Sequence, residues 1–206
     1  MKRLREDGKE DEIKAVYEAF FIFAGMWAFG ASLDEDKVSF SNGWKSASKI
    51  KFPEQGMCFD YFFDVIEGTW IHWDTQVEPF DKSYDGLYNN LVVPTAETTR
   101  QKFLLDMHVN SFKGVLYVGT AGTSKTTIIN DYFSKLDPET RETQGISMNS
   151  YTDSAALQVV IMSRVDKLSG RTFGPPPGKT LIYFMDDLNM PKLDKYFTQN
   201  PICLVR

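Results

Sequence analysis

Residues 119–126 read G-T-A-G-T-S-K-T and restrict the possible folds of this chain more than any other stretch. A short apolar run at 115–118 precedes them, and apolar residues spaced three and four apart follow between Ile128 and Leu136. A strand, a glycine-containing loop that ends in Lys-Thr, and a helix together form the context of a phosphate-binding P-loop. Successive backbone N–H groups of such a loop make an anion-binding nest, and the helix N-terminus adds partial positive charge. The pattern predicts that the phosphates of ATP or ADP bind to Gly119, Thr120, Ala121, Gly122, Thr123, Ser124, Lys125, Thr126 and Thr127.

Two side chains and one departure from the pattern decide how well this loop works. Lys125 is predicted to reach the β- and γ-phosphates, and Thr126 to place its hydroxyl on Mg²⁺. The pattern G-x-x-x-x-G-K-[ST] asks for glycine just before the lysine, and this chain has Ser124 there. Glycine tolerates backbone conformations that a Cβ penalises, so Ser124 predicts weaker binding or an altered phosphate grip. The alternative is a surface turn rich in Gly, Ser and Thr that binds nothing.

The second half of the predicted site is an acidic pair that follows an apolar run. Residues 181–185 read L-I-Y-F-M, as expected for a strand buried on both faces of a parallel sheet. Asp186 and Asp187 follow directly, which is the form of a Walker B strand, and Asp186 is predicted to hold Mg²⁺ directly or through water. The next position usually carries a glutamate that orients the attacking water, so Asp187, one methylene shorter, is the catalytic candidate. The alternative is an ordinary turn at a strand end.

Composition excludes several other classes of function. The 206 residues carry a net charge of −5, whereas a nucleic-acid-binding surface would show a basic bias. The two cysteines, Cys58 and Cys203, form no motif, which indicates reduced thiols in a cytosolic compartment. The first residues lack the apolar core of a signal peptide, and the most apolar stretch, 19–33, is shorter than the roughly 20 residues that span a bilayer. We therefore expect no nucleic acid partner and no membrane segment.

The first 80 residues predict helices followed by a β-hairpin. Apolar residues recur at three and four along 12–32 and cover nearly every face of the predicted helix, and a shorter amphipathic helix is expected at 39–49. The first helix packs either against something outside this chain or in the core of its own fold. Residues 57–77 predict a hairpin with its turn at 65–68. Its aromatic residues are expected to be buried cross-strand pairs rather than a base- or carbohydrate-stacking platform; they are Tyr61, Phe63, Trp70 and Trp73.

A short apolar segment lies upstream of the P-loop. In P-loop proteins such a segment often walls the adenine, which makes Val92 and Val93 candidates for that role. Thr95 is the expected N-cap of a helix that runs to about His108.

Downstream of the P-loop helix, the pattern predicts a second strand and a second helix. The strand is expected at 145–149 and the helix at 153–167. Residues 174–179, G-P-P-P-G-K, predict a rigid loop into the Walker B strand, with a Pro-rich SH3 ligand as the alternative. Together with the runs at 115–118 and 181–185, these elements predict an α/β fold of three parallel strands with flanking helices.

Several further stretches carry a family resemblance. They are F-A-G-M-W-A-F-G at 23–30, F-P-E-Q-G at 52–56, V-P-T at 93–95 with Glu97, Thr98 and Arg100, F-G-P-P at 173–176, and F-M-D-D-L-N-M-P at 184–191. With these stretches and the P-loop, the chain resembles axonemal dynein heavy chains over essentially its full length. The last stretch is highly characteristic of that family.

The resemblance implies a fragment that spans the end of the second AAA+ module and the start of the third. Residues 1–86 would be the end of the preceding module plus a linker, which would give the first helix its missing partners. Residues 87–206 would be an incomplete AAA+ nucleotide-binding core, with sensor one, the arginine finger and the helical lid beyond the last residue. Small-residue and Asp-Asp variants occur in the third modules of that family, which makes Ser124 and Asp187 less anomalous.

The implied function is that of an ATP- or ADP-binding segment whose nucleotide state regulates a dynein motor in microtubule-based ciliary motility. The implied partners are the other AAA+ modules of the ring and, through the full-length protein, intermediate and light chains and microtubules in an axoneme. One alternative is a truncated structural fragment that binds no nucleotide, and a weaker one is a self-contained P-loop ATPase of another kind. An arginine finger normally comes from a neighbour and contributes on the order of 10³–10⁵ in rate, so we expect no hydrolysis by the isolated chain.

Overall fold

A computed structural model of the protein describes residues 10–80 and 91–205, with side chains from residue 13 onward. The chain forms two compact units, Met1–Phe112 and Lys113–Arg206. The domain boundary predicted between residues 86 and 87 lies outside the described residues, so it stays a prediction.

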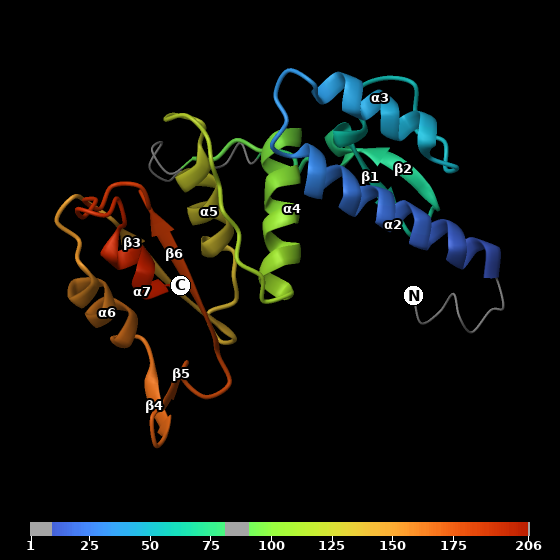
Figure 1. The fold of residues 1–206 in the computed structure, drawn as a ribbon. Coiled ribbons are helices and arrows are strands. Elements are labelled where there is room, and N and C mark those ends of the chain that lie inside the picture. The colour runs from blue at the N-terminus through green and yellow to red at the C-terminus, as the bar shows by residue number, and fades with distance from the viewer. Residues whose placement is uncertain (1–9, 81–90, 206) are drawn as a thin grey trace. The chain divides into compact units, whose positions relative to one another are not determined.

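The first unit consists of helices around a two-stranded hairpin. In chain order, its elements are α2 (Glu10–Gly30), α3 (Lys37–Ala47), the 3-10 helix η1 (Cys58–Asp60), β1 (Tyr61–Asp64), β2 (Thr69–His72), the 3-10 helix η2 (Trp73–Gln76) and α4 (Ala96–Asn110) (Figure 1). The two strands are antiparallel, with Tyr61 opposite His72 and Asp64 opposite Thr69. The predicted hairpin is therefore confirmed, with strands shorter than the aromatic runs suggested.

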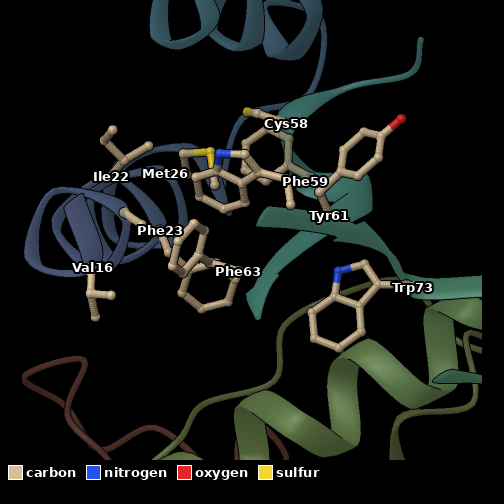
Figure 2. Packing of buried hydrophobic residues seen from close by; sticks show 11 residues of the cluster. Val16, Ile22, Phe23, Met26, Cys58, Phe59, Tyr61, Phe63 and Trp73 are labelled. Carbon is tan, nitrogen blue, oxygen red and sulfur yellow. The ribbon is translucent and has the colours of Figure 1, made fainter. Parts of the chain in front are cut away.

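One face of α2 packs on the hairpin and forms the core of this unit. Figure 2 shows side chains from α2 pointing toward those of η1 and β1. The α2 residues that take part recur at three and four, and each is at most 6% exposed; they are Val16, Ala19, Ile22, Phe23 and Met26. The predicted burial of the hairpin aromatics is confirmed, since each is at most 7% exposed; they are Tyr61, Phe63, Trp70 and Trp73. Burying each large apolar side chain contributes about 1.5–3 kcal/mol, so this cluster stabilises the unit.

The opposite face of α2 is apolar but exposed. The core of the first unit therefore buries only part of the apolar surface of this helix. Tyr17, Phe21 and Phe29 are 45%, 71% and 72% exposed. Within the described residues, Ile13–Gly30 is long and apolar enough to cross a membrane by length and composition alone, which corrects the expectation that no stretch is long enough. A core helix passes the same test, and the buried face of α2 favours that interpretation.

Aromatic packing and one arginine attach α4 to the first unit. The ring of Phe103 lies 5.2 Å from that of Trp73, measured between centroids. Arg100 donates a hydrogen bond of 3.2 Å to the carbonyl oxygen of Phe59, and its guanidinium carbon lies 5.4 Å from the Trp27 ring. A charged hydrogen bond combined with a cation–π contact fixes the helix more firmly than apolar packing alone.

The second unit has an α/β arrangement around two parallel strands. In chain order, its elements are α5 (Lys125–Ser134), β3 (Arg141–Ser147), α6 (Ser154–Met162), β4 (Asp166–Ser169), β5 (Thr172–Gly174), β6 (Thr180–Asp186) and α7 (Asn200–Val205) (Figure 1). Strand β3 pairs with β6 in parallel, from Arg141 opposite Thr180 to Ser147 opposite Asp186. The predicted α/β fold with a parallel sheet and flanking helices is confirmed.

Helices α5 and α6 cover opposite faces of this sheet. Phe133 of α5 meets Phe184 of β6 with 6.3 Å between ring centroids. The adjacent Tyr183 points to the other face, because strand side chains alternate, and its hydroxyl donates a hydrogen bond of 2.8 Å to the carbonyl oxygen of Ile161 in α6. Burial raises the pKa of the Tyr183 hydroxyl. Leu157, 1% exposed, lies at the centre of the core on the α6 side.

The run at 115–118 is not a strand, which corrects the expectation of three parallel strands. It pairs with none of the strands in the described part of the chain. Leu116 and Val118 are 72% and 85% exposed, so their side chains have no sheet face to pack on. An apolar run becomes a strand only where another strand supplies partners for its N–H and C=O groups.

The helix expected at 153–167 ends earlier, at Met162, and a β-hairpin of β4 and β5 follows. Gly170 lies between these strands with a φ of +55°, a conformation that glycine adopts readily. The helix predicted from apolar periodicity was wrong in this part, because Leu168, which was counted as one of its apolar residues, belongs to β4. Its side chain lies against Gly174 of β5, where an added Cβ would come within 2.7 Å of Leu168 Cδ1.

Strand β3 begins at Arg141, four residues before the expected start at 145. Polar side chains hid the first part of this strand from a search for apolar runs. Arg164, which follows α6, donates hydrogen bonds of 2.7 Å to Gln144 Oε1 and 3.3 Å to Glu142 Oε1. The polar side chains thus have partners on the sheet face, which allows a polar segment to pair as a strand.

Candidate nucleotide site

The P-loop leads directly into α5, which begins at Lys125. Ser124 precedes the helix in the left-handed backbone region, with φ 61° and ψ 17°. Gly122 is also left-handed, with φ 79°. Such a conformation is free of strain for glycine and costs another residue about 1–2 kcal/mol. Ser124 therefore has the left-handed backbone conformation for which the P-loop pattern uses glycine. Because serine has a Cβ, the backbone at this position is strained.

The ammonium group of Lys125 lies on the inner side of the loop. It donates hydrogen bonds of 3.0 Å to the carbonyl oxygen of Gly119, 2.7 Å to that of Thr120 and 3.1 Å to Thr123 Oγ1. The Thr123 hydroxyl in turn donates to the Thr120 carbonyl oxygen at 2.9 Å. An ammonium group has three donors, and these three acceptors match that number. Lys125 must therefore exchange some of these acceptors for phosphate oxygens when an anion binds to the loop.

The two parts of the predicted magnesium site meet in the structure. Thr126 Oγ1 donates a hydrogen bond of 2.9 Å to Asp186 Oδ2, and both side chains are half-buried. Thr126 is in the first turn of α5, whereas Asp186 is the last residue of β6. The other carboxylate oxygen, Oδ1, accepts a hydrogen bond of 3.0 Å from the backbone N–H of Asp187. These two bonds orient the carboxylate and leave it lone pairs for a metal ion or its water.

Asp187, the catalytic candidate, lies directly after β6 in a left-handed conformation with φ 54°. Its side chain is exposed, and its carbonyl oxygen accepts a hydrogen bond of 2.9 Å from the Met190 N–H, which closes a turn. Aspartate tolerates left-handed backbone better than most residues, because its short polar side chain bonds locally. The structure therefore explains why the chain turns at Asp187, and the catalytic role of this residue stays a prediction.

Val92 and Val93 lie in the first compact unit, whereas the P-loop belongs to the second. Val92 is half-buried, and Val93 is 53% exposed. They come just before α4, whose predicted N-cap is confirmed, since Thr95 Oγ1 accepts a hydrogen bond of 3.2 Å from the Thr98 N–H. The assignment of the two valines to an adenine pocket stays a prediction.

Sequence reasoning missed the loop after β3. Ser147 pairs with Asp186 in the strand register, and the Met148 N–H donates to the Asp186 carbonyl oxygen at 3.0 Å. The loop then turns at Asn149, whose N–H donates to Thr152 Oγ1 at 3.0 Å. Because the carboxyl ends of adjacent parallel strands lie at the same edge, this polar loop borders the acidic pair. The polar run that follows the predicted strand was the sequence signal from which this loop could have been predicted.

Two protein families match this chain. Residues 1–75 match the family described as "Dynein heavy chain AAA lid domain", and residues 80–206 match "P-loop containing dynein motor region". The second match covers more than half of the chain and includes the P-loop and the acidic pair. The chain belongs to the dynein heavy-chain family. Residues 76–79 separate the two matched segments of this dynein sequence.

The most similar relatives include several axonemal proteins. Dynein axonemal heavy chain 17 of Homo sapiens is 38% identical over 202 residues, covering 95% of this chain and 4% of that protein. Dynein beta chain, ciliary, of Tripneustes gratilla is 38% identical over 207 residues, covering 98% and 5%. Dynein beta chain, flagellar outer arm, of Chlamydomonas reinhardtii is 38% identical over 199 residues, covering 94% and 4%. The resemblance to axonemal dynein heavy chains is confirmed, and the chain spans only about one twentieth of these relatives.

Proposed function

We propose that this dynein segment binds ATP or ADP together with Mg²⁺ and that the bound nucleotide regulates the motor of an axonemal dynein heavy chain. The observation that carries the proposal is the 2.9 Å hydrogen bond between Thr126 Oγ1 and Asp186 Oδ2. A P-loop hydroxyl and a carboxylate at the end of a parallel strand are the two protein groups that hold Mg²⁺ in P-loop NTPases. Their contact supports a site that is formed within this unit.

The residues present fit a magnesium ion. Mg²⁺ prefers oxygen ligands, keeps several waters and is usually held by one or two protein groups together with phosphates. The Thr126 hydroxyl and the Asp186 carboxylate supply such oxygens. The positive charge of a bound Mg²⁺ would neutralise part of the charge of the phosphates. Lys125 would exchange the carbonyl oxygens of Gly119 and Thr120 for phosphate oxygens.

The acidic pair favours binding over hydrolysis by this chain alone. Asp187 is one methylene shorter than the usual glutamate, its side chain is exposed, and its backbone is left-handed. A residue that orients the attacking water must reach the γ-phosphate, and a shorter side chain reaches less far. We therefore assign Asp187 a weak catalytic role at most, with the remaining transition-state stabilisation supplied by a neighbouring module.

We further propose the place of this segment in the whole protein. Residues 1–86 are the end of the second AAA+ module and a linker, and residues 87–206 begin the third module. Its partners are the other AAA+ modules of the ring, and through the full-length protein, dynein intermediate and light chains and microtubules. The names of the relatives, which include "axonemal", "ciliary" and "flagellar outer arm", support a location in the axoneme of a cilium or flagellum.

A second candidate function is that of a structural segment that binds no nucleotide. One specific observation favours it: the run at 115–118, which should support the P-loop as a strand, pairs with no strand among the described residues. Ser124 adds strain to the same loop. A loop without a supporting strand would form its anion nest only part of the time.

Nucleotide binding by the purified chain separates these two functions. We would measure binding of ATP and of ADP by calorimetry with and without Mg²⁺, beside the variant Lys125→Ala. The matched control is Lys135→Ala, which removes a lysine at the other end of α5, where Lys135 lies 3.9 Å from Asp131. Binding that requires Mg²⁺ and is lost only with Lys125→Ala supports the regulatory site. A chain that is folded by circular dichroism and binds neither nucleotide overturns it.

A further inference from the structure

Four successive backbone carbonyl groups converge on one side chain in the first unit. The ammonium nitrogen of Lys45 lies 2.9 Å from the carbonyl oxygen of Pro53 and 2.8 Å from that of Gly56. It lies 3.4 Å from the carbonyl oxygens of both Glu54 and Gln55. These acceptors belong to the F-P-E-Q-G stretch, which carried part of the family resemblance and has no part in the nucleotide site.

The number of acceptors suits a primary ammonium group. Such a group has three N–H donors: two short bonds use two of them, and the two longer contacts share the third. Four carbonyl dipoles that point at one place repel each other unless a cation lies between them, as in carbonyl-lined cation sites. We propose that residues 53–56 form a receptor for one small primary ammonium ion and that the Lys45 side chain is its resident ligand.

The loop is built so that its carbonyl oxygens turn inward. Gly56 has a φ of +64°, and an added Cβ there would lie 2.7 Å from Asp60 Oδ2. That same oxygen accepts a hydrogen bond of 2.7 Å from the Met57 N–H, which fixes the end of the loop. The Tyr61 hydroxyl donates to the Gln55 carbonyl oxygen at 2.9 Å. These two bonds, from Met57 and Tyr61, do not involve Lys45, so they favour re-formation of the loop around another cation when the lysine is removed.

The receptor is open to small ions from solvent. The contact of Lys45 with Pro53 is part-buried, whereas its contacts with the next three carbonyl oxygens are exposed. A compact ammonium group donates along three tetrahedral directions, whereas a guanidinium is a planar fork. The site is therefore expected to accept methylammonium in place of Lys45, and to reject arginine and tetramethylammonium, which lacks N–H donors.

Cleavage of the full chain by a glutamate-specific protease tests this proposal. Glu54 is exposed within the loop, so cleavage after it reports loop opening, and cleavage after the exposed Glu67 in the hairpin turn is the internal reference. Loss of charged hydrogen bonds should make Lys45→Ala about tenfold more rapidly cleaved after Glu54 than the wild type, with Glu67 unchanged. Methylammonium chloride should slow cleavage of the variant after Glu54 in a saturable way and leave the wild type unchanged.

The controls separate the receptor from general charge and stability effects. Tetramethylammonium chloride at the same ionic strength should protect nothing, Lys51→Ala should behave as the wild type, and Lys45→Arg should stay rapidly cleaved. If Lys45→Ala unfolds, cleavage after both Glu54 and Glu67 becomes faster. Slowing of both cleavages by methylammonium but not by tetramethylammonium would still support the receptor. Equal cleavage of the variant and the wild type, protection by tetramethylammonium, or full protection by arginine overturns it.

Discussion

The hydroxyl of Thr126 donates a hydrogen bond of 2.9 Å to Oδ2 of Asp186, although 60 positions separate the two residues. The bond connects the first turn of α5 to the last residue of β6. It brings together the two halves of the predicted magnesium site, which the sequence shows only as two separate patterns. The stability of this contact can therefore be tested separately from nucleotide binding.

Replacing Thr126 by valine keeps the shape of the side chain and removes the hydroxyl. We expect a loss of about 1–2 kcal/mol in the free energy of unfolding, because the bond is part-buried and its acceptor is charged. Magnesium-dependent nucleotide binding should fall in the same variant. Urea denaturation measures the first effect and calorimetry the second. Thr126→Ser, which keeps the hydroxyl, should lose little, and an equal loss in both variants would contradict the assignment.

Ser124→Gly should stabilise the second unit by about 0.5–1 kcal/mol, because glycine adopts the left-handed conformation at this position without a Cβ penalty. Relief of strain in the P-loop should also tighten nucleotide binding. Gly122→Ala supplies the reverse test two residues earlier, at a φ of +79° and with open space around the added Cβ. It should destabilise by a similar amount. Thermal unfolding of both variants measures the effect, and a Ser124→Gly variant less stable than the wild type would refute the explanation.

The two cysteines should differ in their reactivity toward thiol reagents. Cys58 is fully buried, and burial raises the pKa of its thiol, so both access and the thiolate fraction are low. Cys203 is exposed. Under native conditions a chromogenic disulfide reagent should label one thiol per chain, and the second should react only as urea unfolds the first unit. Cys203→Ser should abolish the rapid phase, whereas labelling of Cys58 at the same rate would show that this core opens freely.

The loop around Asp194 should lose order in acid. Bonds from the Thr198 N–H at 3.0 Å and the Thr198 hydroxyl at 2.7 Å lower the pKa of the Asp194 carboxyl below its ordinary value of 3.8. A lowered pKa in the folded state means that the carboxylate stabilises the loop above that ordinary value. The stabilisation is lost as the pH falls through the lowered pKa. A pH titration of the Thr198 amide resonance measures this, and Asp194→Asn should remove the transition.

The sequence located the P-loop helix, the strand before Asp187 and the hairpin because each is marked by a pattern of residues a few positions apart. The Lys-Thr pair after glycine and the L-I-Y-F-M run are local patterns, and the structure places α5 and β6 on them. The same reasoning was wrong at 115–118, because pairing of that run depends on a partner strand. It was also wrong beyond Met162, where a hairpin turn at Gly170 replaced the predicted helix.

The sequence by itself determined the family, the α/β class and the residue types that a magnesium-nucleotide site requires. These signals are local: the periodicity of apolar residues and the Lys125–Thr126 pair involve only residues that are close together in the chain. Only the tertiary structure decided that Thr126 contacts Asp186 and that Lys45 lies among the carbonyl oxygens of residues 53–56. Hydrogen bonds between distant residues depend on how strands and helices pack. The propensities of neighbouring residues do not encode that packing, because it is driven by the burial of apolar surface from residues throughout the unit.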